Sequence, residues 1–289
     1  MKVIKDRETL DGWLEECNRQ GDEVGFIPTM GALHAGHLSL VAEAQKSCSK
    51  TIVSIFVNPT QFGPGEDFAQ YPRTFTEDRA KLEEVGCDAV FLPSTETVYP
   101  PGGQTFIRVE PLASQLCGAS RPGHFQGVAT VVSILLNLVR PRRAYFGVKD
   151  YQQFTLIKQM VRDLAMAVEV VGVAIVREQD GLALSSRNSY LTAVEREQAT
   201  ALYRALTAAK TLYQDGESDS KILEDSARQV LLAAGIEKID YVEVRHSETL
   251  VKEWSGQTPV MLIAAKVGKT RLIDNMLLNQ ETAINEGNG

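Results

Sequence analysis

The sequence predicts an α/β fold in which a parallel sheet carries helices on both faces and a smaller α+β unit follows. Up to about residue 176, short apolar runs rich in β-branched residues alternate with segments of helical period. This alternation of strand and helix is typical of a parallel sheet. Beyond it, two long helical segments precede three strand-like runs. We therefore expect two domains, residues 1–176 and residues 177–289.

The elements of the first domain follow one another as strand, helix and strand. Strands are expected at 23–29, 51–57, 88–93, 143–147 and 168–176. The run at 51–57 is nearly all apolar, as in a strand that is covered on both faces. Helices are expected at 38–45, 76–86, 127–139 and 151–164. Gly86 is placed to end the second helix, and a polar loop rich in Gly and Pro fills residues 58–72.

The second domain begins with helical segments and ends with strands. Helices are expected at 192–214, with Thr192 as its N-cap, and at 220–235. Antiparallel strands are expected at 239–245, 260–268 and 270–275. The polar tail, residues 279–289, is expected to be frayed.

Composition excludes several classes of protein. The net charge of −7 over 289 residues disfavours a broad basic surface for nucleic acid. The four cysteines form no C-x-x-C pair and are typical of reduced thiols in the cytoplasm. The N-terminus lacks the apolar core of a signal peptide, and the longest apolar stretch, 128–139, is shorter than the ~20 residues that span a bilayer. We expect a cytoplasmic protein with neither a nucleic-acid nor a membrane partner.

The strongest chemical signal is the segment 28–37, which reads PTMGALHAGH. It follows the first buried strand, and a helix is expected to begin at about Gly36. The amides of a helix N-terminus suit phosphate, and His34 and His37, three residues apart, lie on one side of the turn. Gly36 removes a Cβ where a nucleotide would approach the backbone. Because open α/β sheets bind ligands at the carboxyl ends of their strands, this segment predicts a nucleoside triphosphate site.

Two other interpretations of the paired histidines stay open at this point. The two histidines could simply cap a helix at the surface. They could also bind zinc, because paired histidines occur in zinc sites. Metal-binding helices more often use histidines four residues apart with a carboxylate nearby. No Asp or Glu lies between Glu23 and Glu43, which disfavours zinc.

Two later segments offer cationic and hydroxyl groups. The segment 180–188, DGLALSSRN, follows the last parallel strand, and its serines with Arg187 form either an anion clamp or a polar linker. The segment 146–153, FGVKDYQQ, aims Lys149 at the carboxyl edge of the sheet. Between Glu110 and Asp150 the chain has no carboxylate but five cations: Arg121, Arg140, Arg142, Arg143 and Lys149. We expect Arg142 and Arg143 to face water and the others to make this region positive.

Several single residues are weaker candidates. Gln61 follows the second strand of the buried series and points at the same edge, where Gln153 could act opposite it, although glutamines are common in loops. His124 suits a ligand contact and an ordinary loop position equally well. Asp78 or Glu77 could help to seat Mg²⁺, but solvation on a helix surface is the favoured interpretation.

Taken together, these motifs resemble the pantoate–β-alanine ligase (pantothenate synthetase) family. The resemblance is carried, in order, by PTMGALHAGH, SIFVNPTQF, YPRT, RPGHFQGV, FGVKDYQQ and DGLALSSRN, along most of residues 24–190. It implies a Rossmann-type ATP-binding domain of the nucleotidyltransferase class with a C-terminal lid. His34–His37 then matches a HIGH motif, and residues 184–187 match a KMSKS-like loop. The resemblance further implies Mg·ATP and a homodimer.

The same resemblance implies a role for each matched residue. ATP contacts are implied at Met30, Gly31, Ala32, Leu33, His34, Ala35, Gly36, His37, Gly147, Val148, Lys149, Asp150, Val176, Leu184, Ser185, Ser186 and Arg187. His37 is implied as a proton donor, Gln61 as the site of pantoate and β-alanine, and Gln153 as a pantoate contact. The expected catalytic residues are His34, His37, Lys149 and Arg187, and the ligands of the metal are not assigned.

The chain departs from the family pattern at two positions. Thr60 stands where Met is frequent, and Val148 stands where Glu is frequent. Neither departure removes a matched polar group, although Thr60 alters the expected pantoate pocket. After about residue 195 the match is weak and implies only a lid-like domain.

The expected reaction is ligation of pantoate and β-alanine to pantothenate through pantoyl adenylate, with release of pyrophosphate and AMP. Two alternatives share the histidine motif or the fold. A cytidylyl- or adenylyltransferase would form a nucleotide diester and stop there, and a non-catalytic nucleotide-binding module would release nothing. A class I aminoacyl-tRNA synthetase is disfavoured by the acidic composition and by the lack of an evident tRNA-binding extension.

Overall fold

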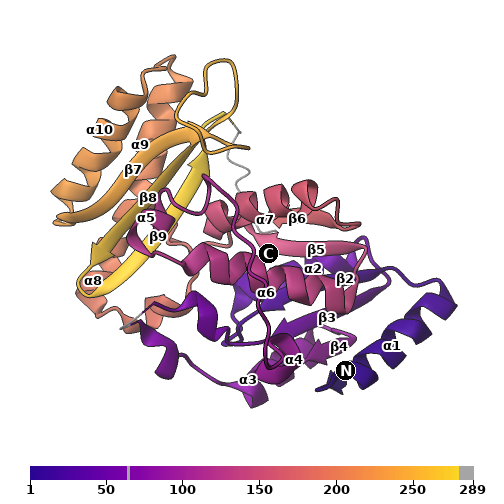
Figure 1. Cartoon of the computed structure of the whole chain (residues 1–289). Coiled ribbons are helices and arrows are strands. Elements are labelled where there is room, and N and C mark those ends of the chain that lie inside the picture. The colour runs from indigo at the N-terminus through magenta and orange to yellow at the C-terminus, as the bar shows by residue number, and fades with distance from the viewer. Residues whose placement is uncertain (64–65, 280–289) are drawn as a thin grey trace. The chain divides into compact units, whose positions relative to one another are not determined.

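Six parallel strands form the larger sheet of the computed structural model, which describes residues 1–63 and 66–279 (Figure 1). The strands are β1 (Lys2–Ile4), β2 (Val24–Thr29), β3 (Lys50–Ile55), β4 (Ala89–Phe91), β5 (Arg143–Gly147) and β6 (Glu169–Val173). Their order across the sheet is β1-β4-β3-β2-β5-β6. The chain winds outward from β2 through β3 to β4 and then returns to place β5 on the other side of β2. The switch point, where such sheets bind ligands, therefore lies between β2 and β5.

The register brings the carboxyl ends of these two strands level. Phe26 of β2 is paired with Ala144 of β5. The last residue of each strand, Thr29 and Gly147, is three residues further on. The turns that follow β2 and β5 therefore leave the sheet side by side at one edge.

Helices cover both faces of this sheet. On one face lie α2 (Ala35–Gln45) and α3 (Phe75–Glu84), and their side chains share a core with Ile27, Val53 and Val90 of the strands. Helices α6 (His124–Val139) and α7 (Tyr151–Asp163) pack on each other and on β2, β5 and β6, and α1 (Arg7–Gln20) packs on α6. Short helices in the connections are α4 (Thr95–Val98), α5 (Cys117–Ser120), η1 (Pro59–Gln61), η2 (Asp67–Ala69), η3 (Val148–Asp150) and η4 (Ser186–Tyr190).

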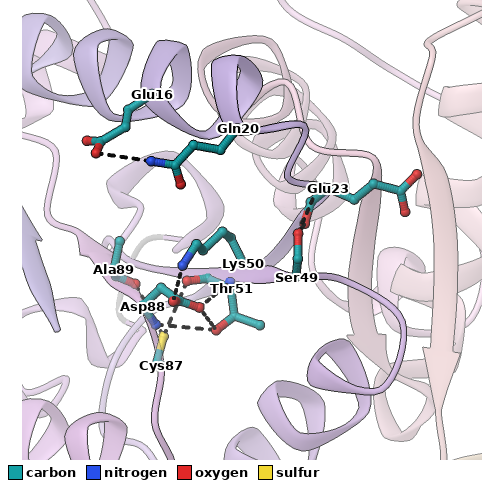
Figure 2. Close-up of polar contacts among 9 residues, drawn as sticks. All are labelled: Glu16, Gln20, Glu23, Ser49, Lys50, Thr51, Cys87, Asp88 and Ala89. Atoms are coloured by element: carbon teal, nitrogen blue, oxygen red, sulfur yellow. Dashed lines mark hydrogen bonds and ion pairs between the residues drawn. The ribbon is translucent and has the colours of Figure 1, made fainter.

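A carboxylate ties two strands together at the amino end of the sheet (Figure 2). Asp88, just before β4, accepts hydrogen bonds from the Thr51 N–H at 2.8 Å and from the Thr51 hydroxyl at 3.2 Å. Lys50 Nζ lies 3.4 Å from the same carboxylate. Ser49 Oγ accepts the N–H of Glu23, which joins the approach to β2 to the start of β3. This network lies at the end of the strands opposite to the switch-point turns.

Three of the four arginines between Glu110 and Asp150 also belong to this amino end. Arg143, the first residue of β5, binds Glu23 and Glu169, and its side chain is only 24% exposed. Arg142 also pairs with Glu23, and Arg140 pairs with Asp11. The expectation that Arg143 faces water is therefore wrong, because carboxylates distant in sequence fold onto it.

The smaller sheet is antiparallel and belongs to the second part of the chain. Strands β7 (Lys238–His246), β8 (Pro259–Val267) and β9 (Thr270–Leu277) pair in that order. Helices α8 (Ala193–Ala199), α9 (Ala201–Gln214) and α10 (Ser220–Ala233) precede them and share a core with them. The chain divides into two compact units, one of residues 1–177 with 184–186 and the other of residues 178–183 with 187 onward.

The predicted elements are present, and the main differences are the following. The expected single helix at 192–214 is two helices, α8 and α9, with Thr200 between them; the Thr200 hydroxyl donates to the Glu197 carbonyl at 2.7 Å. The strand expected at 168–176 ends at Val173, and the helix expected at 127–139 begins at His124. The elements β1 and α1 were not expected. The tail from residue 280 lies outside the described residues.

Within residues 1–63 and 66–279, none of the helices combines the length and apolarity that crossing a bilayer requires.

Candidate active site

A tight turn follows β2 and presents the two histidines. Gly31 has φ of 83° and Ala32 has φ of 52°, so two successive residues take the left-handed conformation. At Gly31 a Cβ would lie 3.0 Å from the Ile55 side chain and 3.1 Å from the carboxylate of Asp78, so glycine is needed for both space and backbone. The Thr29 hydroxyl accepts the N–H of Gly31 and donates to the Ser54 carbonyl of β3.

The two imidazoles cap the helix that follows, α2. His34 Nδ1 accepts the N–H of Gly36 at 3.1 Å, and His37 Nδ1 accepts the N–H of His34 at 3.3 Å. A neutral imidazole has one accepting and one donating nitrogen, so both Nε2 atoms carry the proton. The ring centroids lie 4.1 Å apart. The turn therefore holds two Nε2–H donors next to each other.

Gly36 contributes to this cap. A Cβ at Gly36 would lie 2.9 Å from the His34 ring, so the missing side chain makes room for the imidazole. The Gly36 amide, which the sequence offered to phosphate, is already bonded to His34. The donors that the turn presents are thus the imidazoles themselves.

Both histidines are held neutral by their surroundings. Burial lowers the pKa of His37 to about 3, and the neighbouring His34 acts in the same direction. Burial also lowers the pKa of His34, and the positive charges of Lys149 and Lys81 lower it further. The charge of Lys149 reaches both imidazoles, so the turn after β5 and the turn after β2 form one electrostatic site.

Asp78 is buried beneath the turn, which corrects its expected place on a solvated helix surface. Its side chain lies on α3 and is only 1% exposed. The carboxylate accepts the N–H of Ala32 at 2.9 Å and the N–H of Leu33 at 2.7 Å. Three residues further along α3, Lys81 Nζ donates to the Leu33 carbonyl at 2.5 Å.

The second turn of the site follows β5. Gly147 leads into η3, which contains Val148, Lys149 and Asp150, and α7 begins at Tyr151. Gln153 is in the first turn of α7 and is half-buried. Its neighbour Gln152 is buried, accepts the N–H of Cys117 and donates to the Leu112 carbonyl, so that side chain is occupied by the protein.

Gln61 joins the loop after β3 to the turn after β2. Its amide nitrogen lies 3.2 Å from Met30 Sδ, and its amide oxygen accepts from Asn58 at 3.1 Å. Asn58 is buried and also accepts from the hydroxyls of Thr60 at 2.9 Å and Tyr99 at 2.7 Å. Thr60, one of the two departures from the family pattern, therefore adds a hydroxyl hydrogen bond within the loop that carries Gln61.

The start of α6 supports Gln61 from behind. Arg121 donates to His124 Nε2 at 3.0 Å, so the His124 proton is on Nδ1, which donates to the Gln61 carbonyl at 2.8 Å. Burial and the Arg121 charge lower the pKa of His124 to about 4. Arg121 itself pairs with Glu66. Both ring nitrogens of His124 thus bond within the protein, and the histidine helps to hold the loop that carries Gln61.

The remaining predicted residues lie further along the chain. The Val176 carbonyl accepts the N–H of Leu184 at 3.0 Å. Residues 184–186, which include Ser185 and Ser186, belong to the first unit, and Arg187 belongs to the second. The structure thus brings together, in the first unit, the turns that carry His34, His37 and Lys149 and the loop that carries Gln61.

In the described part of the chain no group of three or more His, Cys, Asp or Glu side chains is placed to hold a metal ion.

A parallel sheet with its switch point between two donor-bearing turns defines a Rossmann-like α/β protein. The chain also matches the model of the pantoate–β-alanine ligase family over residues 2–277, and it belongs to that family.

Individual relatives agree with this assignment. A pantothenate synthetase of Magnetococcus marinus is 55% identical over 285 residues, covering 97% of each chain. A pantothenate synthetase of Thermotoga neapolitana is 50% identical and covers 96% of this chain and all of its own.

Solved structures share the fold. That of pantothenate synthetase from Thermus thermophilus has a TM-score of 0.90 at 46% identity, covering 96% of this chain and 99% of that one. That of a pantoate–β-alanine ligase from Francisella tularensis, complexed with β,γ-ATP and β-alanine, has a TM-score of 0.79 at 35% identity, covering 97% and 99%.

Proposed function

We propose that this ligase forms pantothenate from pantoate, β-alanine and ATP at the switch point between β2 and β5. The observation that carries the proposal is the pair of Nε2–H donors on His34 and His37, within electrostatic reach of Lys149. Neutral donors and a fixed cation suit the triphosphate of ATP, because they bind its charge without a proton having to move first.

The first step is attack of a pantoate carboxylate oxygen on the α-phosphorus. A bond forms between that oxygen and phosphorus, and the bond from phosphorus to the bridging oxygen of the β-phosphate breaks, so pantoyl adenylate and pyrophosphate result. His34, His37 and Lys149 would stabilise the charge that develops on phosphate oxygens. The family resemblance assigns His37 as the proton donor, and as a neutral imidazole it would donate an Nε2–H hydrogen bond to the departing pyrophosphate while keeping the proton.

The second step is attack of the β-alanine amine on the acyl carbon of the adenylate. The new C–N bond displaces AMP, and the amine loses a proton. We assign pantoate and β-alanine to Gln61, whose amide contacts Met30 and Asn58, and pantoate to Gln153. An amide suits these substrates because it donates to a carboxylate or hydroxyl without adding charge.

ATP contacts are assigned to the remaining matched segments. They comprise residues 30–37, residues 147–150, Val176 and residues 184–187. Arg187 would bind phosphate oxygens in the bidentate geometry of a guanidinium. Residues 177–289 are assigned the role of a lid, because an acyl adenylate must be kept from water.

Mg²⁺ is proposed to reach the site on ATP. Both oxygens of Asp78 accept backbone N–H bonds, so this carboxylate does not fit a metal ligand. A set of donors that could cage an ion is lacking among the described residues as well. Mg²⁺ often binds through substrate phosphates and water, which suits this donor set.

A cytoplasmic location and a homodimer are also proposed. The location rests on the four cysteines, which are buried free thiols as in proteins of a reducing compartment. The homodimer rests on the family alone, and sedimentation equilibrium would test it.

Omission of each substrate in turn tests the proposed function. AMP should appear only when ATP, pantoate and β-alanine are all present, whereas pyrophosphate exchange into ATP should need pantoate but not β-alanine. Lys149→Ala should slow the exchange by at least about a hundredfold. A nucleotide diester as the end product would instead indicate a nucleotidyltransferase, and exchange without pantoate would refute the first step.

A further inference from the structure

Helix α3 holds the histidine turn at a single residue from two sides. The carboxylate of Asp78 accepts the N–H of Leu33, and the ammonium of Lys81 donates to the carbonyl of the same residue. The two side chains are three residues apart, so they lie on one face of α3. Leu33 immediately precedes His34, the N-cap of α2. Both backbone groups of the residue before the catalytic turn are therefore fixed by one helix.

The turn needs such support because its backbone is unusual. Ala32 has a side chain but takes φ of 52°, a conformation that such residues rarely adopt. Its N–H is the second backbone group that Asp78 accepts. Two backbone donors are thus satisfied by one buried carboxylate, at the place where the chain departs from β2. Without it, both N–H groups would lose their acceptor, and that of Leu33 would be left unpaired in a buried position.

The histidines depend on this backbone for their proton positions. The N–H of His34 fixes His37 Nδ1 as an acceptor, and the N–H of Gly36 fixes His34 Nδ1. A shift of residues 32–34 would misalign these bonds and release both imidazoles from the Nε2–H form. Lys81 also adds positive charge beside the rings, since it contributes to the lowered pKa of both histidines.

We infer that Asp78 and Lys81 are positioning residues for catalysis, which set the orientation and tautomer of His34 and His37 through the backbone of Leu33. This inference rests on the proposed function for its effect on turnover, but its effect on the imidazoles is independent of any substrate. Neither side chain is assigned a contact with ATP. Their action runs through the turn.

Asp88 offers a matched control at the opposite end of the sheet (Figure 2). It too is a carboxylate that accepts a backbone N–H, from Thr51 at 2.8 Å, and lies beside a lysine, Lys50. It therefore performs the same structural task away from the histidines. A loss that comes only from weakened packing should appear in both Asp78→Ala and Asp88→Ala, whereas a loss of positioning should appear only in Asp78→Ala.

The direct readout is the nitrogen NMR spectrum of the imidazoles in the full-length protein without substrate. The chain has only four histidines, so each can be assigned by substitution. The wild-type spectrum should show Nε2–H forms for His34 and His37 and an Nδ1–H form for His124. Asp78→Ala should shift His34 and His37 toward a mixture of tautomers and leave His124 unchanged. Asp88→Ala should leave all of them unchanged.

The kinetic readout is pantoate-dependent pyrophosphate exchange, measured after urea titration has shown that each variant is folded under the assay conditions. Asp78→Ala should reduce the maximal exchange rate by about a hundredfold, as expected when catalytic groups are misplaced by about 1 Å. The apparent KM for pantoate should change much less. Asp78→Asn, which keeps one acceptor oxygen, should retain an intermediate rate, and Asp88→Ala should exchange at close to the wild-type rate.

Lys81 keeps the inference testable if Asp78→Ala does not fold. Lys81→Met should lower the exchange rate and disturb the same two tautomers, and Lys81→Arg, which keeps charge and donors, should restore both. Wild-type imidazole signals in Asp78→Ala, or in Lys81→Met if the former does not fold, would overturn the inference even if the rate fell. A wild-type protein that shows the expected tautomers but no pantoate-dependent exchange would instead refute the proposed function.

Discussion

Acidification from pH 7 to pH 5 is expected to destabilise the first unit through two imidazoles that the fold keeps neutral. Burial lowers the pKa of His37 to about 3 and that of His124 to about 4. An imidazole in the unfolded chain has a pKa of about 6.5. Between these values the unfolded chain binds a proton that the folded protein does not, so stability falls as the pH falls.

The size of the effect follows from proton linkage. A pH of 5 lies 1.5 units below the pKa of about 6.5 of an unfolded imidazole, so the unfolded chain carries the proton. In the folded protein both imidazoles remain mostly neutral at this pH. Each histidine then contributes a loss of about 2 kcal/mol between pH 7 and pH 5. This loss continues toward the folded pKa of each group and is absent above about pH 8, where neither state is protonated.

Urea unfolding at the two pH values would measure this loss. Trp254→Phe leaves Trp13 of α1 as the fluorescent reporter of the first unit, since the chain has two tryptophans. In that background, His37→Gln and His124→Gln should each reduce the change in unfolding free energy between pH 7 and pH 5 by about 2 kcal/mol. An unchanged pH dependence in His37→Gln would mean that His37 is not held neutral, and the assignment of its donor would fail.

Three further predictions concern the site itself. His37→Gln places an amide nitrogen near the position of Nε2, so this variant should form adenylate faster than His37→Asn. The rate of His37→Asn should fall by about a hundredfold or more. Equal rates in the two variants would indicate that the Nε2–H donor is not used. Gln61→Ala should weaken pantoate more than ATP in steady-state kinetics, and equal weakening of both would count against its role in binding pantoate. Gly127→Ala would place a Cβ 2.5 Å from the Thr60 carbonyl oxygen and so displace the loop that carries Gln61. The KM for pantoate should then rise more than the KM for ATP. A wild-type KM for pantoate would show that this loop does not depend on α6.

The larger sheet could be predicted from sequence because its strands are short apolar runs set between helical periods. The runs that became β2, β3 and β5 are buried on both faces, and this burial is visible as continuous hydrophobicity. The strand at β1 is only three residues long and gives too little pattern to recognise. The helix at α1 did carry a signal, since Leu10, Trp13, Leu14 and Cys17 follow helical spacing between an Asp6 cap and Gly21.

The site could be predicted only where its residues are close in sequence or follow adjacent strands. His34, His37 and Lys149 share one edge because β2 and β5 are neighbours, which strand alternation and the motifs together indicate. The role of Asp78 could not be predicted, because its partners at residues 32 and 33 are 45 or more positions away. The same holds for Arg143, whose carboxylate partners come from two other segments.

The sequence predicted the position of the two histidines but not the hydrogen bonds that their rings make. Their spacing predicted a pair on one side of a turn, which is confirmed by the ring separation of 4.1 Å. The spacing did not show that each Nδ1 accepts a backbone N–H. That arrangement depends on backbone angles at residues 31 and 32, and it decides which nitrogen faces a substrate.

A crystal structure of the protein with a non-hydrolysable ATP analogue and pantoate tests the central claim most directly. We expect triphosphate oxygens at hydrogen-bond distance, about 3 Å, from Nε2 of His34 or His37 and from Lys149 Nζ, with pantoate beside Gln61. A triphosphate bound at the amino end of the strands, beside Asp88 and Arg143, would contradict it.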